Sequence, residues 1–427
     1  MSEGGHRVSN KSIVVAALST VVEWYDFTLY LYFATVLSRV FFGGGEGSLL
    51  ATLGGFAVAY LMRPVGAVVF GHIGDRKGRR PMLLWSMAVM SAAMLATALL
   101  PTHAQIGPAA MWLLLAMRCV MGFSVGGEYT GVIAYLLEGA RPERRGLVAS
   151  LAAAASEVGA LLAVAIAALT VSLMSEADLQ SWGWRIPFLV GAALAGAVWF
   201  ARSMMEESPD FERLRDAGTL AVNPLAHAVT RQWRGLLRAF AISALGSITY
   251  YVGITYVPAF LASVGSIGEA DSLWLATVAA IAVIAVTPVV GWLSDRFGRK
   301  PALIVLAVLS AALPITLFSL MAGASADRAL VGAVVLALVA GGVSSVGAIA
   351  TGEQFTEESR ASGLGLGYTM ATVFFGGLTP YVAQRLVDQT GWAEVPGVMI
   401  AVVAVVVLPV FVMMRETAPR RRQDPLP

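Results

Sequence analysis

The sequence has 427 residues, of which 57% are hydrophobic and 13% are charged, with a formal net charge of +2. Soluble domains carry about 25% charged residues, so a chain this apolar could not bury its hydrophobic surface in water. The small net charge gives no reason to expect nucleic-acid binding, and a single cysteine, Cys119, excludes an internal disulfide. The composition predicts a protein that crosses a membrane several times.

Apolar stretches long enough to cross hydrocarbon follow one another along the chain. The first contains Glu23 and Asp26 and lacks a small-residue cleavage site, so we interpret it as a retained helix rather than a signal peptide. We expect an all-α membrane protein whose twelve spans cover residues 12–37, 50–71, 82–100, 109–136, 147–174, 185–202, 237–262, 272–292, 302–322, 329–350, 362–385 and 396–414.

A polar segment divides these spans into two sets of six. We predict a bundle at 1–202, a cytoplasmic linker at 203–235 without chemistry of its own, a second bundle at 236–416 and a tail at 417–427. The tail is short and basic, which predicts a disordered anchor at the membrane surface.

Loop cations set the expected orientation. The loops 43–49, 101–108, 263–271 and 388–395 contain no lysine or arginine. The alternate loops and the tail carry Arg76, Lys77, Arg79, Arg80, Arg141, Arg144, Arg145, Arg296, Arg299, Lys300, Arg415, Arg420, Arg421 and Arg422. Membrane proteins keep such cations on the cytoplasmic side, so we expect both termini in the cytoplasm and the chain in the plasma (inner) membrane.

The pattern G-x-x-x-D-R-x-G-R-[RK]-P occurs at 71–81 and again at 291–301, and a repeat of half the chain length predicts two similar halves. A glutamate and an arginine six residues apart also recur, as Glu138 with Arg145 and Glu353 with Arg360. We predict a gate in which carboxylates bind a neighbouring helix N-terminus in one state and release it in another. Its candidate residues are Asp75, Arg76, Arg79, Glu138, Arg145, Asp295, Arg296, Arg299, Glu353 and Arg360. The alternative is that the arginines only fix topology.

Three further motifs sharpen the interpretation: Glu23-Trp24-Tyr25-Asp26-Phe27, the run from Gly122 to Tyr129, and Trp182-Gly183-Trp184-Arg185-Ile186-Pro187-Phe188. Together with the repeat, they resemble the metabolite:proton symporter family of the major facilitator superfamily, which includes proline/betaine, citrate and 2-oxoglutarate carriers. The resemblance implies alternating access around a central site between the halves. The sequence departs from the family in lacking a long coiled-coil tail and in carrying Glu157 in the fifth span.

Ionisable groups inside hydrocarbon are costly and therefore candidates for function. The proton-coupling candidates are Glu23, Asp26, Arg118, Glu128 and Glu157. Glu23 and Asp26 lie three residues apart and share a helix face, where two nearby acids favour proton uptake. Arg118, four residues before Gly122, also resembles the proton-transfer motif of the superfamily's fourth span. The alternatives are structural pairing of an acid with Arg118 and, for Glu157, a neutral carboxyl hydrogen-bonded to a neighbouring helix.

Aromatic side chains are candidates for substrate contact because aromatic faces suit a quaternary ammonium group. They are Trp24, Tyr25, Tyr129, Tyr250, Tyr251 and Tyr256, and in this fold spans 1 and 7 are expected to face each other. The alternative is that they are core or interfacial aromatics. The glycines spaced four apart in the fourth span, Gly122 with Gly126 and Gly127 with Gly131, predict close helix packing.

We therefore predict a secondary active transporter that moves a proton together with a zwitterion such as proline or betaine, or an organic acid such as citrate or 2-oxoglutarate. The intramembrane acids favour a zwitterion or monocarboxylate. We expect no enzyme activity, cofactor or metal, and no ATP dependence, because no nucleotide-binding loop is present. The expected partners are the metabolite, the proton and the lipid bilayer, with the chain acting as a monomer. The alternatives are a proton-coupled exporter or antiporter of the same superfamily and a non-transporting membrane sensor.

Overall fold

The computed structural model describes residues 9–45, 47–218, 223–264, 267, 269–323 and 325–419. The predictions for the end of the tail, including Arg420, Arg421 and Arg422, and for the linker residues 219–222 lie outside these residues. Every regular element in the described part is a helix, as the apolar stretches predicted.

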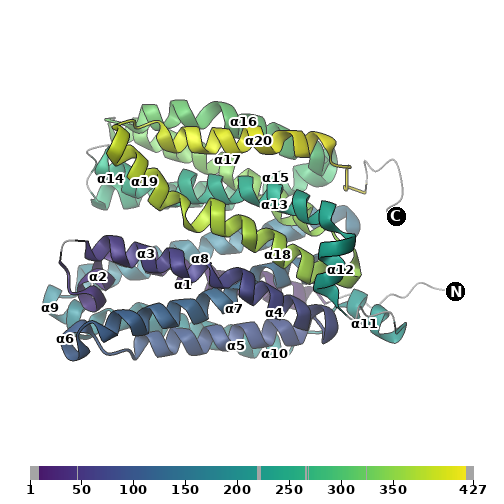
Figure 1. The fold of residues 1–427 in the computed structure, drawn as a ribbon, viewed down its shortest axis with the longest axis horizontal. Helices are drawn as coiled ribbons and strands as arrows, with labels where there is room; N and C mark the ends of the chain where they lie inside the picture. The colour runs from purple at the N-terminus through teal and green to yellow at the C-terminus, as the bar shows by residue number, and fades with distance from the viewer. Residues whose placement is uncertain are drawn as a thin grey trace. The chain divides into compact units, whose positions relative to one another are not determined.

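The first half of the chain forms ten α-helices and two short helices of other types (Figure 1). They are α1 (Asn10–Tyr32), α2 (Ala34–Phe42), α3 (Ser48–Tyr60), α4 (Met62–Arg76), α5 (Arg79–Ala98), α6 (His103–Ile106), α7 (Ala109–Gly139), η1 (Pro142–Arg144), α8 (Arg145–Leu173), α9 (Glu176–Asp178), η2 (Leu179–Gly183) and α10 (Arg185–Ser203).

Two helices lie in the linker, and the second half follows them. These elements are α11 (Pro209–Asp216), α12 (Pro224–Arg231), α13 (Trp233–Tyr250), η3 (Tyr251–Thr255), α14 (Val257–Ser263), α15 (Glu269–Phe297), α16 (Arg299–Met321), α17 (Ala326–Gly352), η4 (Glu357–Ser359), α18 (Arg360–Thr372), η5 (Val373–Gly377), α19 (Thr379–Thr390) and α20 (Val395–Met413).

Among the described residues, eleven helices are long and apolar enough to cross a membrane. The expected span at 362–385 is not one of them. There α18, the π-helix η5 and α19 follow one another with only Leu378 between η5 and α19. This run occupies the position of the remaining expected span.

The helices gather into two compact units. Unit 1 contains Met1–Gly139, Ala155–His227 and Glu357–Thr369, and unit 2 contains Ala140–Ala154, Ala228–Thr356 and Met370–Pro427. Each unit therefore includes a short segment from the other half of the sequence. The start of α18 belongs to unit 1, and the start of α8 belongs to unit 2. The predicted division of the chain into bundles at 1–202 and 236–416, which was based on the sequence repeat, stays a prediction.

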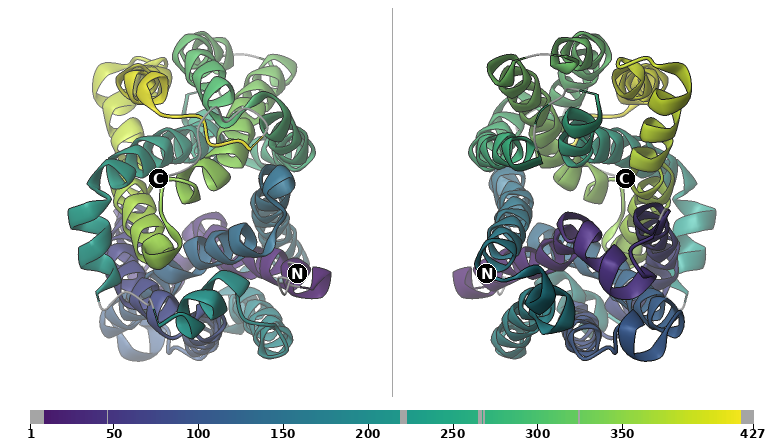
Figure 2. Two further views of the ribbon diagram at one scale, coloured as in Figure 1. Left: turned by 90° about the vertical axis from the view of Figure 1, so that its right-hand side faces the viewer. Right: turned by 90° about the vertical axis from the view of Figure 1, so that its left-hand side faces the viewer.

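The same helix pairings occur within both units. In unit 1, α7 packs against α1, α4 and α5, and α10 packs against α1 and α5. In unit 2, α17 packs against α13, α15 and α16, and α20 packs against α13 and α16. The bundles can be seen end-on in Figure 2. Because equivalent spans make equivalent pairings, the packing agrees with the internal repeat in the sequence.

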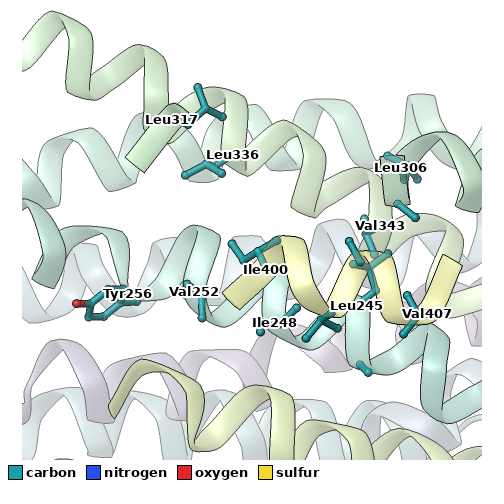
Figure 3. Packing of buried hydrophobic residues seen from close by; sticks show 14 of the residues in the cluster. Leu245, Ile248, Val252, Tyr256, Leu306, Leu317, Leu336, Val343, Ile400 and Val407 are labelled. Carbon is teal, nitrogen blue, oxygen red and sulfur yellow. The ribbon is translucent and has the colours of Figure 1, made fainter. Parts of the chain in front are cut away.

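Unit 2 is built around a large apolar cluster. Leu245 and Ile248 of α13, Leu306 of α16, Val343 of α17 and Ile400 of α20 are buried in it (Figure 3). Large apolar side chains also remain exposed, among them Leu99, Phe200, Trp274, Val406 and Met413. An exposed apolar surface is expected of helices that face lipid, where the hydrophobic effect does not drive burial.

Glycines allow α7 to touch α3 and α4 in unit 1. A Cβ at Gly122 would overlap with the carbonyl oxygen of Ala59 in α3, and a Cβ at Gly126 would overlap with that of Arg63 in α4. A Cβ at Gly66 would likewise overlap with the carbonyl oxygen of Phe123. The predicted packing role of the glycines in the fourth span is confirmed, and it sets α4 directly against α7.

Candidate functional site

A buried ion pair connects the first and fourth spans. Asp26 of α1 accepts hydrogen bonds from both terminal nitrogens of Arg118 of α7, at 2.8 Å from Nη1 and 3.3 Å from Nη2. The guanidinium also lies over the ring of Tyr30 and approaches the hydroxyl of Thr97. Asp26 is fully buried and Arg118 is 4% exposed. A single buried charge would be strongly destabilising, so each group makes the burial of the other possible.

A second acid on the same helix face holds its arginine more loosely. One oxygen of Glu23, Oε1, accepts a hydrogen bond of 3.3 Å from Nη2 of Arg63 of α4. The Arg63 guanidinium lies 4.7 Å from the ring centre of Phe27 and 4.8 Å from that of Tyr60. Glu23 is 1% exposed, and its second oxygen, Oε2, accepts no hydrogen bond from the described residues.

In a third pair the carboxylate has donors on both oxygens. Both oxygens of Glu128 of α7 are bound by Arg202 of α10, and the Ser86 hydroxyl donates to Oε2 at 2.5 Å. Arg202 also donates to the carbonyl oxygen of Leu83, at 2.8 Å, and to the Ser19 hydroxyl. The contacts of Glu128 thus fit the structural-pairing alternative better than proton exchange.

The sequence interpretation missed Arg63 and Arg202 as partners. Arg202 is the last residue of its expected span, where an arginine usually marks the membrane boundary, whereas Arg63 lies inside the expected span 50–71. The signal that could have found them is charge balance. Four acids in the spans of the first half were weighed against Arg118, with Arg63 interpreted only as a cation near a helix end, although buried carboxylates require cations nearby.

Glu157 lies in α8 and is buried. Tyr129 of α7 lies within electrostatic reach of both Glu157 and Glu23. The Tyr129 ring also contacts that of Tyr368 of α18, with 5.2 Å between ring centres. Unit 1 therefore brings two candidate acids and one candidate aromatic together, and it adds Tyr368, which the motifs did not identify.

The other aromatic candidates divide into two groups. Tyr25 is fully buried and donates a hydrogen bond of 2.8 Å to the carbonyl oxygen of Pro187, so it connects two of the family-like motifs. Tyr256 donates to Gln384 at 2.9 Å and packs in the apolar cluster of unit 2 (Figure 3). These contacts fit the core-packing alternative.

The remaining aromatic candidates are Trp24, Tyr250 and Tyr251. Trp24 is buried near Phe27, with 6.3 Å between ring centres. Tyr250 and Tyr251 contact each other edge to face at 5.4 Å in unit 2. The expectation that spans 1 and 7 face each other stays a prediction.

The first copy of the repeated motif binds a helix N-terminus. Asp75, at the end of α4, accepts hydrogen bonds from the backbone N–H groups of Ala361 and Ser362, at 3.2 and 2.9 Å, in the first turn of α18. Arg79 donates to Asp75 at 2.5 Å. A carboxylate placed there satisfies N–H groups that have no partner within their own helix, and it interacts favourably with the helix dipole.

The second copy makes the same contacts in unit 2. Asp295 of α15 accepts hydrogen bonds of 2.9 Å from the N–H groups of Gly146 and Leu147 in the first turn of α8. Arg299 donates to Asp295 at 2.7 Å. Each half of the sequence therefore supplies a carboxylate that caps a helix of the other half.

The repeated glutamate–arginine motif is also exchanged between the halves. In unit 1, Glu138 accepts hydrogen bonds from Arg79 at 2.8 Å and from Arg360 at 3.1 Å. In unit 2, Glu353 lies 3.5 Å from Arg299 and within electrostatic reach of Arg145. Burial raises the pKa of Glu353 above its ordinary value.

Arg76 and Arg296 do not join these clusters. Both are exposed, and Arg296 lies over the rings of Trp292 and Phe297.

The glycines of the motif have separate physical roles. A Cβ at Gly71 would lie 2.9 Å from the Cα of Ser362, and a Cβ at Gly291 would lie 2.6 Å from the Cβ of Ser150. Gly71 and Gly291 therefore leave room for the capped helix to come close to the helix that carries the aspartate. The aspartate follows each of these glycines by one helical turn. Gly78 and Gly298 have φ angles of +111° and +108°, which other residues rarely adopt.

Sequence reasoning also missed a second capping acid in each half. Glu207 accepts hydrogen bonds from the backbone N–H groups of Arg79 and Arg80, and Glu416 accepts them from those of Arg299 and Lys300. Burial raises the pKa of Glu207. The signal was a shared pattern, Met204-Met205-Glu206-Glu207-Ser208 and Met413-Met414-Arg415-Glu416-Thr417.

Ser208 and Thr417 complete the parallel, because their hydroxyls donate to Glu138 and Glu353. In unit 1, Asp210 of α11 also lies 3.2 Å from Arg360. The linker therefore contributes Glu207, Ser208 and Asp210 to these clusters, and the expectation that it has no chemistry of its own stays a prediction. Nowhere in the described part of the chain do three His, Cys, Asp or Glu residues gather to hold a metal ion.

The fold and these buried charges define a secondary transporter. Residues 12–227 match the family of sugar (and other) transporters, and residues 257–427 match the Major Facilitator Superfamily. The fold is similar to that of the proton:xylose symporter XylE bound to 6-bromo-6-deoxy-D-glucose, with a TM-score of 0.79, 18% identity, and coverage of 95% of this chain and 96% of that one. The chain belongs to the major facilitator superfamily and has its twelve-helix fold.

Its relatives place it among the superfamily's metabolite:proton symporters. It is 32% identical to the proline/betaine transporter of Salmonella typhimurium over 96% of this chain and 84% of the relative. It is 34% identical to the alpha-ketoglutarate permease of Escherichia coli, covering 88% and 87%. It is 30% identical to the citrate-proton symporter of Klebsiella pneumoniae, covering 94% and 90%.

Proposed function

We propose that this protein takes up a small zwitterion together with a proton across the plasma membrane. The observation that carries the proposal is the arrangement of Glu23 and Asp26 on one face of α1, each paired with a buried arginine from another span. A carboxylate in such a pair can exchange its cation partner for a proton, and this change in charge can drive a movement of helices.

Glu23 is the first site of proton binding in this mechanism. It holds Arg63 through one oxygen at 3.3 Å, and its other oxygen has no hydrogen-bond donor among the described residues. Protonation therefore weakens one contact and removes the negative charge that a buried oxygen carries without a hydrogen-bond donor. Asp26 is the second site, because two hydrogen bonds to Arg118 must be lost before it takes a proton.

The capped helices serve as the gate. With Asp75 bound to the first turn of α18 in unit 1 and Asp295 bound to the first turn of α8 in unit 2, each half of the sequence holds a helix of the other half. Release of these caps frees the two helices, and the arginine–glutamate clusters around Glu138 and Glu353 oppose that release. By the positive-inside rule, we propose that the two motifs lie on the cytoplasmic side.

The acid and aromatic groups of unit 1 favour a zwitterion. Glu157 lies within electrostatic reach of Tyr129, and the ring of Tyr129 contacts that of Tyr368. A cationic head could bind near Glu157 and the rings of Tyr129 and Tyr368. An organic acid is the second candidate, because the relatives include citrate and alpha-ketoglutarate carriers. The protein acts as a monomer without a cofactor and without enzyme activity.

Uptake by proteoliposomes tests the proposal. Purified protein is supplied with labelled proline, betaine, 2-oxoglutarate, citrate or shikimate under an imposed pH gradient, acidic outside. We expect accumulation of proline or betaine, and its collapse when a protonophore is added. Accumulation driven instead by a gradient that is acidic inside would favour the antiporter alternative. No flux of any compound would favour a sensor.

Two substitutions locate the proton. Per folded molecule, Glu23→Gln and Asp26→Asn should each abolish accumulation against a gradient while leaving exchange of labelled for unlabelled substrate, because exchange needs no net proton movement. Glu143→Gln is the matched control, since Glu143 is an exposed acid outside these clusters. Full accumulation by both site variants would remove the two acids from the coupling mechanism.

A further inference from the structure

Three arginines of unit 2 lie close together where α13 begins and α20 ends. Arg234 and Arg238 are one turn apart on α13, and Arg415 comes just after α20, which packs against α13. Arg238 lies within electrostatic reach of both other arginines. Among the described residues, no carboxylate forms an ion pair with any of the three. The neighbouring acid, Glu416, is bound to backbone N–H groups of Arg299 and Lys300.

The internal repeat shows that topology does not require this cluster. The offset of 220 residues places Val14 and Leu18 of α1 at the positions of Arg234 and Arg238. Both are apolar and about half exposed, at 51% and 53%. The shared pattern after the last span of each half places Glu206 at the position of Arg415. The first half therefore reaches the same fold without any of these cations.

The surroundings of the cluster are those of a membrane interface. Trp233 and Leu237 alternate with the arginines on α13 and are 55% and 54% exposed. The Arg234 guanidinium lies 5.4 Å from the ring centre of Trp233. Tryptophan prefers the headgroup level of a bilayer, and arginine binds phosphate oxygens through two parallel N–H groups. Exposed apolar and cationic groups thus lie together on α13, as is typical of the level of lipid phosphates.

We propose that Arg234, Arg238 and Arg415 form a binding site for the phosphate of an anionic phospholipid headgroup, with Trp233 and Leu237 against its acyl chains. Close like charges without acidic partners repel one another, and a bound phosphate removes this repulsion. The anionic lipid therefore stabilises the contact between α13 and α20, the first and last spans of the second half of the chain.

Native mass spectrometry of the purified full-length protein tests this site by counting retained phosphatidylglycerol and phosphatidylcholine. The site variant carries Arg234→Gln, Arg238→Gln and Arg415→Gln. The matched control carries Lys77→Gln, Arg141→Gln and Arg144→Gln, which remove the same charge from exposed positions elsewhere. We expect the wild-type and control proteins to retain phosphatidylglycerol in preference to phosphatidylcholine. Each arginine removed at the site should weaken phosphatidylglycerol binding roughly fivefold.

A third variant, with lysine at all three site positions, keeps the charge and should retain most of the binding, so the test does not depend on folding of the glutamine variant. Equal loss of lipid in site and control variants would overturn the proposal, as would equal retention of the two lipids by the wild-type protein. Displacement of phosphatidylglycerol by a modest excess of inorganic phosphate would also overturn it, because the ligand would then be free phosphate.

Discussion

The buried carboxylates of unit 1 differ in how completely their arginines satisfy them. Glu128 has partners on both oxygens and a serine donor, Asp26 has two hydrogen bonds from one guanidinium, and Glu23 has one contact and an open oxygen. A buried polar group with all its partners resists change, whereas one with a missing partner can gain from a new donor. The number of hydrogen-bond partners therefore separates Glu128, which stabilises the bundle, from Asp26 and Glu23, which can exchange a proton.

Glu128→Gln should therefore act on stability rather than on coupling. The substitution leaves the Arg202 guanidinium buried without a counter-charge, a change that typically costs about 3–5 kcal/mol. We expect a lower thermal unfolding midpoint in detergent, with proton-driven uptake per folded molecule preserved.

A double variant provides the control for this prediction. Glu128→Leu with Arg202→Met removes both charges and should recover most of the lost stability, because apolar replacement of a buried pair is often neutral or better. A Glu128→Gln protein that unfolds like the wild type but no longer accumulates substrate would instead place the proton on Glu128.

At the scale of elements, the repeated motif explains how two helices are brought together. The first glycine permits close approach, the aspartate caps the approaching helix, and the second glycine turns the chain so that its arginine returns to the aspartate. The sequence alone predicted the caps at Asp75 and Asp295, because an acid beside arginines between two spans suits a helix N-terminus.

The sequence could not predict which helices they cap. Asp75 caps α18 through Ala361 and Ser362, which follow it by 286 and 287 residues in the sequence, and no local pattern encodes contacts over such a separation. Glu207 escaped prediction because it lies in a polar linker, where acids are common. The pairing of Arg202 was not predicted because the end of an apolar stretch does not reveal whether its last arginine points inward. In contrast, the spans and the repeat follow from hydrophobic length and spacing, and these were predicted closely.

Gly71→Ala and Gly291→Ala should each loosen a capped helix. The added Cβ would meet backbone or Cβ atoms that cannot rotate away, and such overpacking typically costs about 1–3 kcal/mol. Maleimide labelling of Ser362→Cys measures the opening in unit 1, in a Cys119→Ser background that has no other cysteine. With Gly71→Ala, we expect the labelling rate to rise at least roughly fivefold.

Gly196→Ala is the matched control for this experiment, because a Cβ there would meet no atom within 4 Å. Its labelling rate should equal that of the parent protein. An unchanged rate with Gly71→Ala would mean that the helices do not depend on this close approach.

At the scale of the whole molecule, the units and the sequence repeat divide the chain differently. Unit 1 includes Glu357–Thr369 from the second half, and unit 2 includes Ala140–Ala154 from the first. These segments carry the capped first turns and Arg360, which pairs with Glu138. Neither half of the sequence therefore contains all the partners of its own buried charges.

Fragments 1–218 and 219–427 test this dependence. Expressed alone, the first lacks the N–H donors for Asp75 and the second lacks those for Asp295, so both should be degraded rapidly. Expressed together, they should form a stable complex that restores transport. Arg360→Ala in the second fragment should lower the recovery several-fold because Glu138 and Asp210 lose a buried cation. Arg328→Ala, at an exposed position, should not. If each fragment alone resisted proteolysis as well as the intact chain, the bundles at 1–202 and 236–416 would be self-sufficient, and the exchanged segments would serve the gate alone.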